Sequence, residues 1–454
     1  MTKWLWYLFL IFIPVGTRLV IVRPEFGFFE FGSYFVYVSD FLFIILLGCG
    51  IYRMQKKSTT KLSPSPIPAP AKTFVAGFLA LAGLSVFLST QPVLSLFAFI
   101  RLVFFVAFAI WGSRLLLKRE IFLKTLLLVS SLAILEAGIG IGQVIKQGDL
   151  GLAVLGESSI STFDPGTSKI AVLGGRVIRA SGTLPHPNMY AAFLLIGFIS
   201  LCYLYVRADG KLYHFSGRPK FKTFVRNPYF KVRLCLAVGI FIVSAGLLFS
   251  FSRGGWLATT LSALVLLGLL AGVKTYRRAA GRLFLLLVAS AVLLFVLAAP
   301  FIVSRASLPL TDRSLTERVL YNGMALYLTG VYPLGLGIGN YAMFTAENGL
   351  FQTIGLTRIW QWQPVHNLYL LIAAEIGIAG LLCFLIFLGM IGVRIFKNRI
   401  IKYGPERALT LALLVGLLSF GLFDHFLWTL QPGRFLLWLS IGLALSQLPL
   451  KRGN

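Results

Sequence analysis

Long apolar runs, broken by short polar stretches, form the dominant pattern of the chain. Runs of about twenty residues recur, and each is long enough to cross about 30 Å of hydrocarbon as a helix. A membrane barrel would instead show segments of about ten residues with alternating hydrophobicity. The pattern predicts an all-α polytopic membrane protein with about twelve transmembrane helices, near residues 4–22, 34–52, 73–89, 93–112, 125–145, 188–206, 234–250, 256–273, 283–303, 368–392, 408–424 and 433–448.

The polar connections between these runs differ strongly in length. Two long segments, 146–187 and 304–367, are predicted on the outward side, the second between helices 9 and 10. A long basic loop, 207–233, and a proline-rich linker, 53–72, are predicted on the inward side. No stretch is long enough for a separate globular domain, so residues 1–454 are predicted to form a single membrane domain.

Charge supports this orientation. The chain has a formal net charge of +27 but only 13% charged residues, against about 25% in soluble domains. The predicted inward segments, with both termini, hold 29 lysine and arginine residues and 3 acidic residues, whereas the rest holds 13 basic and 12 acidic residues. Because basic residues gather on the cytoplasmic side of membrane proteins, the charge reports topology. It argues against nucleic acid as a partner and for contact with anionic lipid.

The outward basic residues are mostly arginine. They comprise 11 arginine and 2 lysine residues, whereas the inward set has 14 arginine and 15 lysine residues. Orientation requires only positive charge, so this bias favours bidentate binding of phosphate or carboxylate. Scatter among few residues, with arginine's tolerance of partial burial, is the alternative explanation.

The first outward segment ends in a motif that carries Arg179, His186 and Asn188. Prolines on both sides of His186 favour extended backbone there. Asn188 is predicted to cap the helix that follows, and a helix N-terminus favours a nearby anion. The motif is interpreted either as a rigid turn at a helix entry or as a substrate contact through Arg179 and His186.

A short outward turn, 249–256, places Arg253 at the edge of the bilayer. Gly254 and Gly255 permit close approach of another segment, and Trp256 suits the headgroup region. Arg253 is interpreted either as a contact to lipid headgroups or as a ligand for the phosphates of a membrane-embedded substrate.

Within the large outward segment, Ser314 and Glu317 form a capping box that predicts a helix from about 315 to 328. Arg318 would lie in its first turn and share a face with Tyr321 or Asn322 and with Ala325. An anion contact and a surface ion pair are both open interpretations of Arg318. The glycine run 335–339 follows no predicted strand, so it is a weak dinucleotide motif.

His366 stands where this segment meets the next apolar run, and Asn367 beside it is predicted to cap the new helix. A neutral imidazole accepts a proton near pH 7, so His366 is a candidate general base. The alternative is that His366 only makes a structural hydrogen bond. A metal site of the outward histidines with Asp424 is disfavoured because no ligand pair shows helical spacing.

Three motifs together resemble the O-antigen ligase and polymerase superfamily. They are FSRGGW from Phe251, PLGLGIGNY from Pro333, and HNLYL from His366 with EIGIAG from Glu375. The resemblance is strongest between about 179 and 432. It implies a bacterial inner-membrane enzyme with a membrane-glycosyltransferase-like fold. It also implies an active site in the periplasmic loops. The twelve predicted spans and the charge pattern put both termini in the cytoplasm.

The resemblance also implies a reaction and its residues. The donor would be a glycan on undecaprenyl diphosphate, and the acceptor would be lipid A-core, another lipid-linked repeat unit or a protein. His366 would activate the acceptor hydroxyl, Arg253 and Arg318 would hold the diphosphate, and Arg179 is a weaker match; Arg358 matches no motif. His186 and Asn367 are further candidates for substrate binding. We expect inverting transfer without a metal or cofactor, with arginines in place of the cation.

Two other classes of function remain open at this stage. A transporter or flippase for an anionic or lipid-linked solute would need a polar path, for which Arg101, Glu136 and Glu375 are the intramembrane candidates; these three are also predicted to pair with one another. A non-catalytic scaffold among other polysaccharide-assembly proteins would leave His366 and the outward arginines without a shared purpose.

Overall fold

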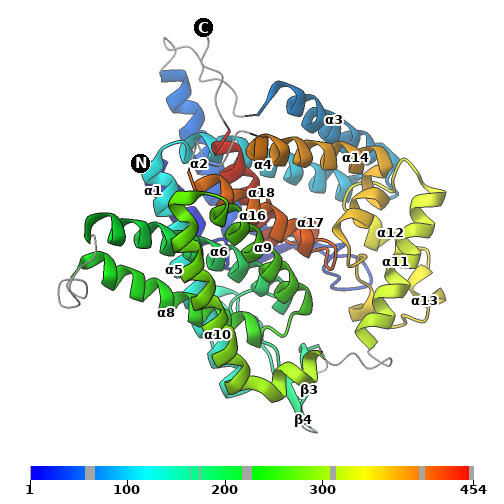
Figure 1. Ribbon diagram of the computed structural model, residues 1–454. Coiled ribbons are helices and arrows are strands. Elements are labelled where there is room, and N and C mark those ends of the chain that lie inside the picture. The colour runs from blue at the N-terminus through cyan, green and yellow to red at the C-terminus, as the bar shows by residue number, and fades with distance from the viewer. Residues whose placement is uncertain are drawn as a thin grey trace.

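The computed structural model describes residues 2–56, 67–164, 166–172, 175–216, 227–306, 313–397 and 404–448 (Figure 1). These residues are mostly helical. The helices are α1 Thr2–Ile11, α2 Val38–Lys56, α3 Ala69–Ser85, α4 Pro92–Leu116, α5 Arg119–Lys146, α6 Pro187–Ser216, α8 Pro228–Phe249, α9 Arg253–Ala271, α10 Lys274–Ala306, α11 Arg313–Val331, α12 Tyr341–Glu347, α13 Leu350–Thr353, α14 Leu368–Lys397, α16 Glu406–Phe420, α17 Phe426–Thr429 and α18 Gln431–Ser446. Two antiparallel hairpins, β1–β2 (Arg18–Val22, Tyr34–Tyr37) and β3–β4 (Lys169–Val172, Gly175–Ile178), and three 3-10 turns complete them.

Eight helices in the described residues are long and apolar enough to cross a membrane: 70–88, 92–116, 119–146, 187–210, 228–249, 253–271, 274–305 and 368–396. The multi-span helical membrane fold is therefore confirmed, whereas the count of twelve stays a prediction. The first predicted helix, 4–22, is wrong over its second half. Helix α1 ends at Ile11, ahead of Pro14 and Gly16, and residues 18–22 form strand β1 instead. Proline and glycine stop the helix there despite the apolar sequence.

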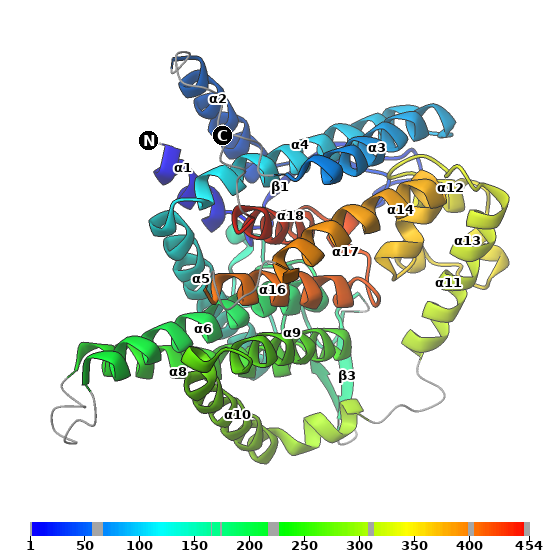
Figure 2. The ribbon, with the colours of Figure 1, turned by 45° about the horizontal axis from the view of Figure 1, so that its top comes forward.

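Helix α6 lies at the centre of the helix bundle. Nearly all of its membrane-spanning window is buried, whereas only about a tenth of the corresponding window of α10 is buried. Helices α5, α8 and α9 pack around α6, and α3, α4, α14 and α18 form a second group. The late helix α16 contacts α6, α9, α14 and α18 and joins the two groups in the middle of the bundle (Figures 1 and 2).

The glycine run 335–339 supplies backbone hydrogen bonds at a break in α14. Gly377 interrupts α14 with a positive φ of 83°. Leu336 and Gly337 donate their backbone N–H groups to the carbonyl oxygens of Ala374 and Glu375, at 2.9 and 3.0 Å. These bonds satisfy carbonyl groups that the break leaves without helical partners. The run is therefore a backbone clamp on α14 and gives no support to the dinucleotide interpretation.

Replacing Gly335 with alanine is expected to destabilise this clamp. A Cβ atom at Gly335 would lie 2.4 Å from the carbonyl oxygen of Glu375, at a residue with φ of +94°. We expect a loss of about 1–3 kcal/mol in unfolding free energy, seen as a lower thermal midpoint in detergent. Gly330→Ala in helix α11 is the control, because nothing lies within 4 Å of its Cβ position. Equal thermal midpoints for the two variants would contradict the role of Gly335.

Ion pairs gather the predicted inward segments at one end of the bundle. Asp209, fully buried, binds Arg233 and Arg282 at 2.8 and 2.6 Å. Glu406 accepts a bond from Tyr203 and lies 3.3 Å from Arg207. Segments far apart in the sequence therefore share this end. The first residues of α6 and α9 lie at the opposite end of their helices.

Candidate functional site

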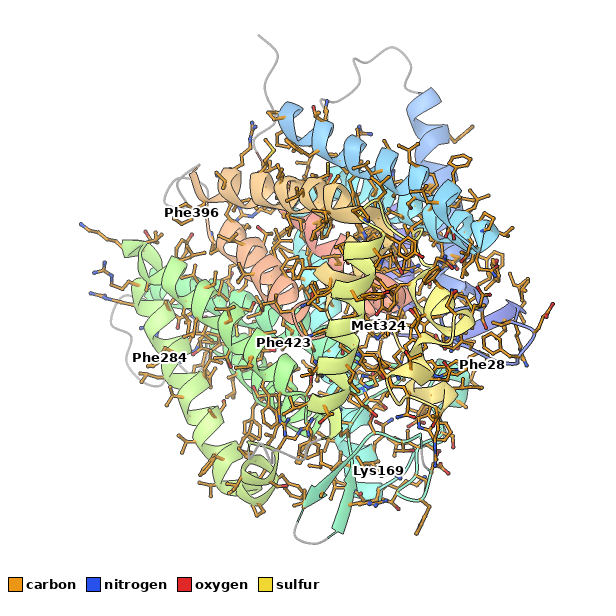
Figure 3. The ribbon with its side chains drawn as sticks, turned by 90° about the vertical axis from the view of Figure 1, so that its right-hand side faces the viewer. Phe28, Lys169, Phe284, Met324, Phe396 and Phe423 are labelled. Atoms are coloured by element: carbon orange, nitrogen blue, oxygen red, sulfur yellow. The ribbon has the colours of Figure 1, made fainter. Side chains whose placement is uncertain are left out.

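Five segments converge at the end of the bundle opposite the basic loops. They are the start of α6, the start of α9, one face of α11, the start of α14 and the connection between α16 and α17. Figure 3 looks onto the α11 side, with Met324 on α11, Phe423 from the α16–α17 connection and Lys169 on β3. Helix starts carry unpaired N–H groups and a partial positive charge, so this convergence suits an anion.

Asn188 connects three of these segments. Its side-chain oxygen accepts bonds from Arg179 Nη2 at 2.8 Å and from Ser252 Oγ at 2.9 Å, and its amide nitrogen donates to Asp424 at 2.5 Å. The prediction that Asn188 caps α6 is wrong, because its side chain is used by these tertiary bonds. His186 takes that place, since its Nδ1 atom accepts the backbone N–H of Asn188 at 3.1 Å.

The turn before α9 is tightly held. Ser252 caps the helix through a bond to the backbone N–H of Gly255 at 3.1 Å. A Cβ atom at Gly255 would lie 2.7 Å from Ala191, so glycine is needed where α9 crosses α6. Phe251 has a positive φ of 48°, an uncommon conformation for a large side chain that is often found at functional turns.

Three arginines lie within electrostatic range of Arg179, namely Arg253, Arg305 and Arg318, and the four will be called the arginine cluster. Arg253 donates to the carbonyl oxygen of Arg305, and Arg305 donates to that of Phe251, both at 2.9 Å. These two bonds join the end of α10 to the start of α9. Arg318, in the second turn of α11, donates to the carbonyl oxygen of Phe423. Burial, followed by repulsion from Arg305 and Arg318, lowers the pKa of Arg179 to about 9.

Helix α11 confirms the predicted face. Tyr321 and Ala325 are buried on the side that carries Arg318. The Tyr321 ring stacks on His366 with ring centroids 5.3 Å apart, and its hydroxyl group donates to the carbonyl oxygen of Gln361. The helix therefore places one cation and one aromatic ring against the candidate base.

His366 is held in a crowded, partly buried position. Its Nδ1 atom is buried and has no hydrogen-bond partner among the described residues. Its ring meets that of His425 edge to face at 4.9 Å. Burial lowers the pKa of His366 well below its usual value, although the nearby Asp424 acts in the opposite direction. A neutral imidazole with an unsatisfied buried nitrogen is a marker of a functional site.

Asp424 is the acidic centre of this group. Its carboxylate accepts the backbone N–H of His425 at 2.7 Å, in addition to the bond from Asn188. Burial would raise the pKa of Asp424, but the surrounding histidines and Arg318 outweigh it and keep the pKa below the usual value. Asp424 therefore stays ionised between the histidines and the arginines.

Asn367 serves the helix that follows it. Its side-chain oxygen accepts the backbone N–H groups of Tyr369 and Leu370 at 2.9 and 3.1 Å, so the predicted cap of α14 is confirmed. Its amide nitrogen lies 3.4 Å from the carbonyl oxygen of Leu422. Both polar ends are in use, and a direct contact between Asn367 and a substrate stays a prediction.

The predicted pairing among intramembrane charges is wrong. Arg101 binds Asp40 at 2.9 Å, Glu136 accepts bonds from Thr183, and Glu375 accepts the indole N–H of Trp428 at 2.7 Å. Hydrophobic periodicity did not reveal these partners, because only the fold brings the first turn of α2, with Asp40, and the connection ahead of α6, with Thr183, near Arg101 and Glu136.

Two pockets adjoin the arginines. One, of about 350 Å³, lies between residues 158–168 and 179–187 and includes Arg179 and His186. The other, of about 400 Å³, is mainly apolar and is formed by α6, α8, α9 and α10, with Trp256 and Ile302 in its wall. Trp256 lies one turn beyond Arg253, and Ile302 lies one turn before Arg305. An apolar groove thus begins where two of the arginines stand.

Sequence reasoning placed Arg179, His186, Arg253, Arg318 and His366 in the site, and the structure brings them into one region. It gave no specific role to Arg305 or Ser252, and it did not predict that Asn188 binds three other side chains. It also assigned no role in the site to Asp424 or His425. Arg358 lies outside the cluster, over the ring of Trp360 at 5.0 Å. The clearest missed signal is Arg305, an arginine at the outward end of a predicted helix.

Comparison with known proteins supports a single family. Residues 238–385 match the family model Wzy_C, described as O-antigen ligase. The comparison with curated proteins gives no match. The matched residues, about a third of the chain, include Arg253, Arg318 and His366, whereas Arg179 and Asp424 lie outside them. The match confirms the resemblance to the O-antigen ligase superfamily.

Proposed function

We propose that this O-antigen ligase superfamily chain transfers a glycan from a polyprenyl diphosphate, such as undecaprenyl diphosphate, to an acceptor hydroxyl group. The observation that carries the proposal is the meeting of four arginines, from α10, α11, the start of α9 and the segment that leads into α6, beside a neutral histidine. Like charges gathered in a partly buried region are unfavourable unless an anion joins them. Asp424 supplies one negative charge beside these arginines, and a diphosphate would supply more.

The donor's lipid chain has a matching surface. The apolar groove of about 400 Å³ lies between α6, α8, α9 and α10, and Trp256 and Ile302 in its wall are one helical turn from Arg253 and Arg305. A diphosphate bound by these arginines would therefore place its polyprenyl chain in the groove and the attached sugar on the side of Arg179 and His366. Burying each methylene group of such a chain contributes about 0.8 kcal/mol.

The reaction needs a base and a stabilised leaving group. In an inverting transfer, the acceptor oxygen attacks the anomeric carbon while the bond from that carbon to the phosphate oxygen breaks. The electron pair leaves with the diphosphate, and the acceptor proton passes to the imidazole of His366. Arg179, Arg253, Arg305 and Arg318 stabilise the developing negative charge, so no metal is required in this scheme.

The fall in the pKa of His366 predicts a pH–rate profile. The imidazole accepts a proton only when neutral, so activity would be lost as pH falls through the pKa of His366. With that pKa held below 6.5 by burial, we expect kcat/KM to lack an inflection near pH 6.5 and to fall only at lower pH. A half-maximal point at 6.5 or above in the free enzyme would contradict the buried, neutral state.

Donor binding is expected to make His366 a stronger base. A diphosphate beside the ring favours the protonated imidazole, and this raises its pKa toward neutrality. The acid limb of the kcat profile, which reports the bound enzyme, should therefore lie at higher pH than that of kcat/KM.

We place the site on the periplasmic face of the bacterial inner membrane, with both termini in the cytoplasm. The positive-inside charge pattern supports this orientation, and the ion pairs of Asp209 and Glu406 bring the basic segments to the end opposite the arginines. Accessibility of a cysteine introduced at exposed Phe163 to a membrane-impermeant reagent in intact spheroplasts would test it. Labelling only after the membrane is opened would reverse the orientation.

The decisive functional experiment offers two acceptors separately to the purified protein in detergent. Lipid A-core with a lipid-linked glycan tests for a ligase, and a lipid-linked repeat unit as its own acceptor tests for a polymerase. Transfer to either acceptor supports the proposal. Absence of transfer, with donor binding intact, would favour a transporter or a scaffold of the polysaccharide-assembly machinery. A transporter would need a continuous polar path lined by Arg101, Glu136 and Glu375. These three residues bind separate partners instead, which argues against a transporter.

A further inference from the structure

The pocket beside Arg179 has a chemistry of its own. It is formed by the loop ahead of β3 and by the segment that leads into α6, and its volume of about 350 Å³ falls in the range of small-molecule sites. It will be called the hydroxyl pocket. Its lining residues are Ser158, Ser159, Ile160, Asp164, Gly166, Thr167, Ser168, Arg179, Ser181, Pro185, His186 and Pro187.

His186 presents a hydrogen-bond donor in this pocket. Its Nδ1 atom accepts the backbone N–H of Asn188. In the neutral ring the proton must then reside on Nε2, because only one of the two nitrogens carries it. Burial lowers the pKa of His186 to about 4, so the ring is neutral at physiological pH. The free side of His186 is therefore an N–H donor and not a base.

Ser181 adds an unsatisfied group. Its side chain is only 3% exposed, and its Oγ atom has no hydrogen-bond partner within the described ranges. A buried hydroxyl group without a partner is unfavourable relative to one that is hydrogen-bonded. Ser181 lines the hydroxyl pocket, so a ligand hydroxyl or amide group there would satisfy it.

The composition of the pocket distinguishes a sugar from a phosphate. Five of the lining side chains carry hydroxyl groups, and Asp164 supplies a carboxylate. A carboxylate accepts bonds from sugar hydroxyl groups but repels phosphate oxygens. Arg179 already uses Nε for the carbonyl oxygen of Ser250 and Nη2 for Asn188. Serine, threonine, histidine and aspartate together match the mixed donors and acceptors of a pyranose ring.

The hydroxyl pocket adjoins the arginine cluster. Arg179 belongs both to the hydroxyl pocket and to the arginine cluster. A group covalently joined to a diphosphate on the arginines would therefore extend directly into the pocket. We infer that the hydroxyl pocket binds the first sugar of the donor, the ring attached to the diphosphate, and that Ser181, His186 and Asp164 discriminate among donor sugars. The inference rests on the proposed function, because it takes a lipid-linked diphosphate glycan as the donor.

The test compares binding of two ligands to the full-length protein in detergent: polyprenyl diphosphate with a glycan, and the same carrier without one. Ser181→Ala and Asp164→Asn are expected to weaken binding of the glycan-bearing carrier by about 3- to 10-fold each, the effect of one lost hydrogen bond. Binding of the bare carrier should stay unchanged. Thr353→Ala, at an exposed residue of α13 outside the pocket, is the control.

Three results would overturn the inference. Equal weakening for both ligands would place the diphosphate in the pocket. Unchanged binding of both ligands in both variants would show that no part of the donor lies there. A rise confined to the KM of the acceptor would assign the pocket to the acceptor. Because binding is measured without turnover, a protein that binds donor but transfers nothing would refute the proposed function and leave the pocket test intact.

Discussion

Replacing His366 with alanine is expected to lower the rate of glycan transfer by about 10²- to 10⁴-fold, the usual contribution of a general base. The imidazole lies between Tyr321 and His425, with a buried nitrogen that has no partner in the described part of the chain. Alanine removes the proton acceptor but leaves the arginines in place. The measurement is kcat in detergent, with donor affinity determined in parallel.

Donor binding distinguishes a lost base from a damaged site. We expect His366→Ala to bind donor nearly as well as the unmodified protein, because the cations that hold the diphosphate are elsewhere. His214→Ala, in the last turn of α6 at the end opposite the site, is the matched histidine control and should transfer glycan normally. Full activity of His366→Ala, at normal membrane levels, would remove His366 from the chemistry.

Replacing Arg318 with glutamine is expected to lower kcat by about 10²- to 10³-fold, as for loss of one group that stabilises developing charge. Arg318 stands in the second turn of α11, within electrostatic range of Arg179, where its guanidinium group favours the leaving diphosphate. Arg318→Lys should recover only part of the loss, because lysine keeps the charge without the planar pair of donors.

Arg358→Gln is the control for this variant. Arg358 belongs to the same long segment but stacks over Trp360, outside the arginine cluster. A charge lost at Arg358 should change kcat little, whereas a general effect of segment charge would reduce both variants equally. Equal losses would show that Arg318 acts only through long-range charge and not through contact with the diphosphate.

The two outcomes separate the roles of the two side chains. His366→Ala should change the acid limb of the pH profile and spare donor affinity. Arg318→Gln should weaken donor binding as well as turnover and leave the acid limb in place. If both variants had the same signature, the histidine and the arginine would be acting as one structural unit.

Most membrane helices were visible in the sequence because the bilayer demands about twenty apolar residues for each. The starts of α6, α9 and α14 fell within a few residues of their predicted positions, since Pro187, Ser252 and Asn367 mark helix entries by local chemistry. The prediction of a helix over the second half of residues 4–22 was wrong. Its apolar residues pair as strand β1, and a window of hydropathy does not distinguish the two conformations.

Partners at long range were beyond local patterns. Asn188 looked like a cap because its position before a helix is all that the sequence shows, yet its side chain binds Arg179, Ser252 and Asp424. Arg101 was expected to pair with Glu136 or Glu375 inside the membrane and instead binds Asp40 in the first turn of α2. Such choices depend on which helices are neighbours.

The sequence by itself determined that the chain is a multi-span membrane protein, where most of its helices begin, and which arginine and histidine residues face a common side. Those properties follow from hydrocarbon thickness, capping and charge, which act over a few residues. Only the tertiary structure decided that Arg305 joins the arginines, that Asp424 stands among the histidines, and that a glycine run repairs α14. The bond between Asn188 and Asp424 in the same region joins residues 236 positions apart. Packing of whole helices, rather than any local preference, brings such residues together.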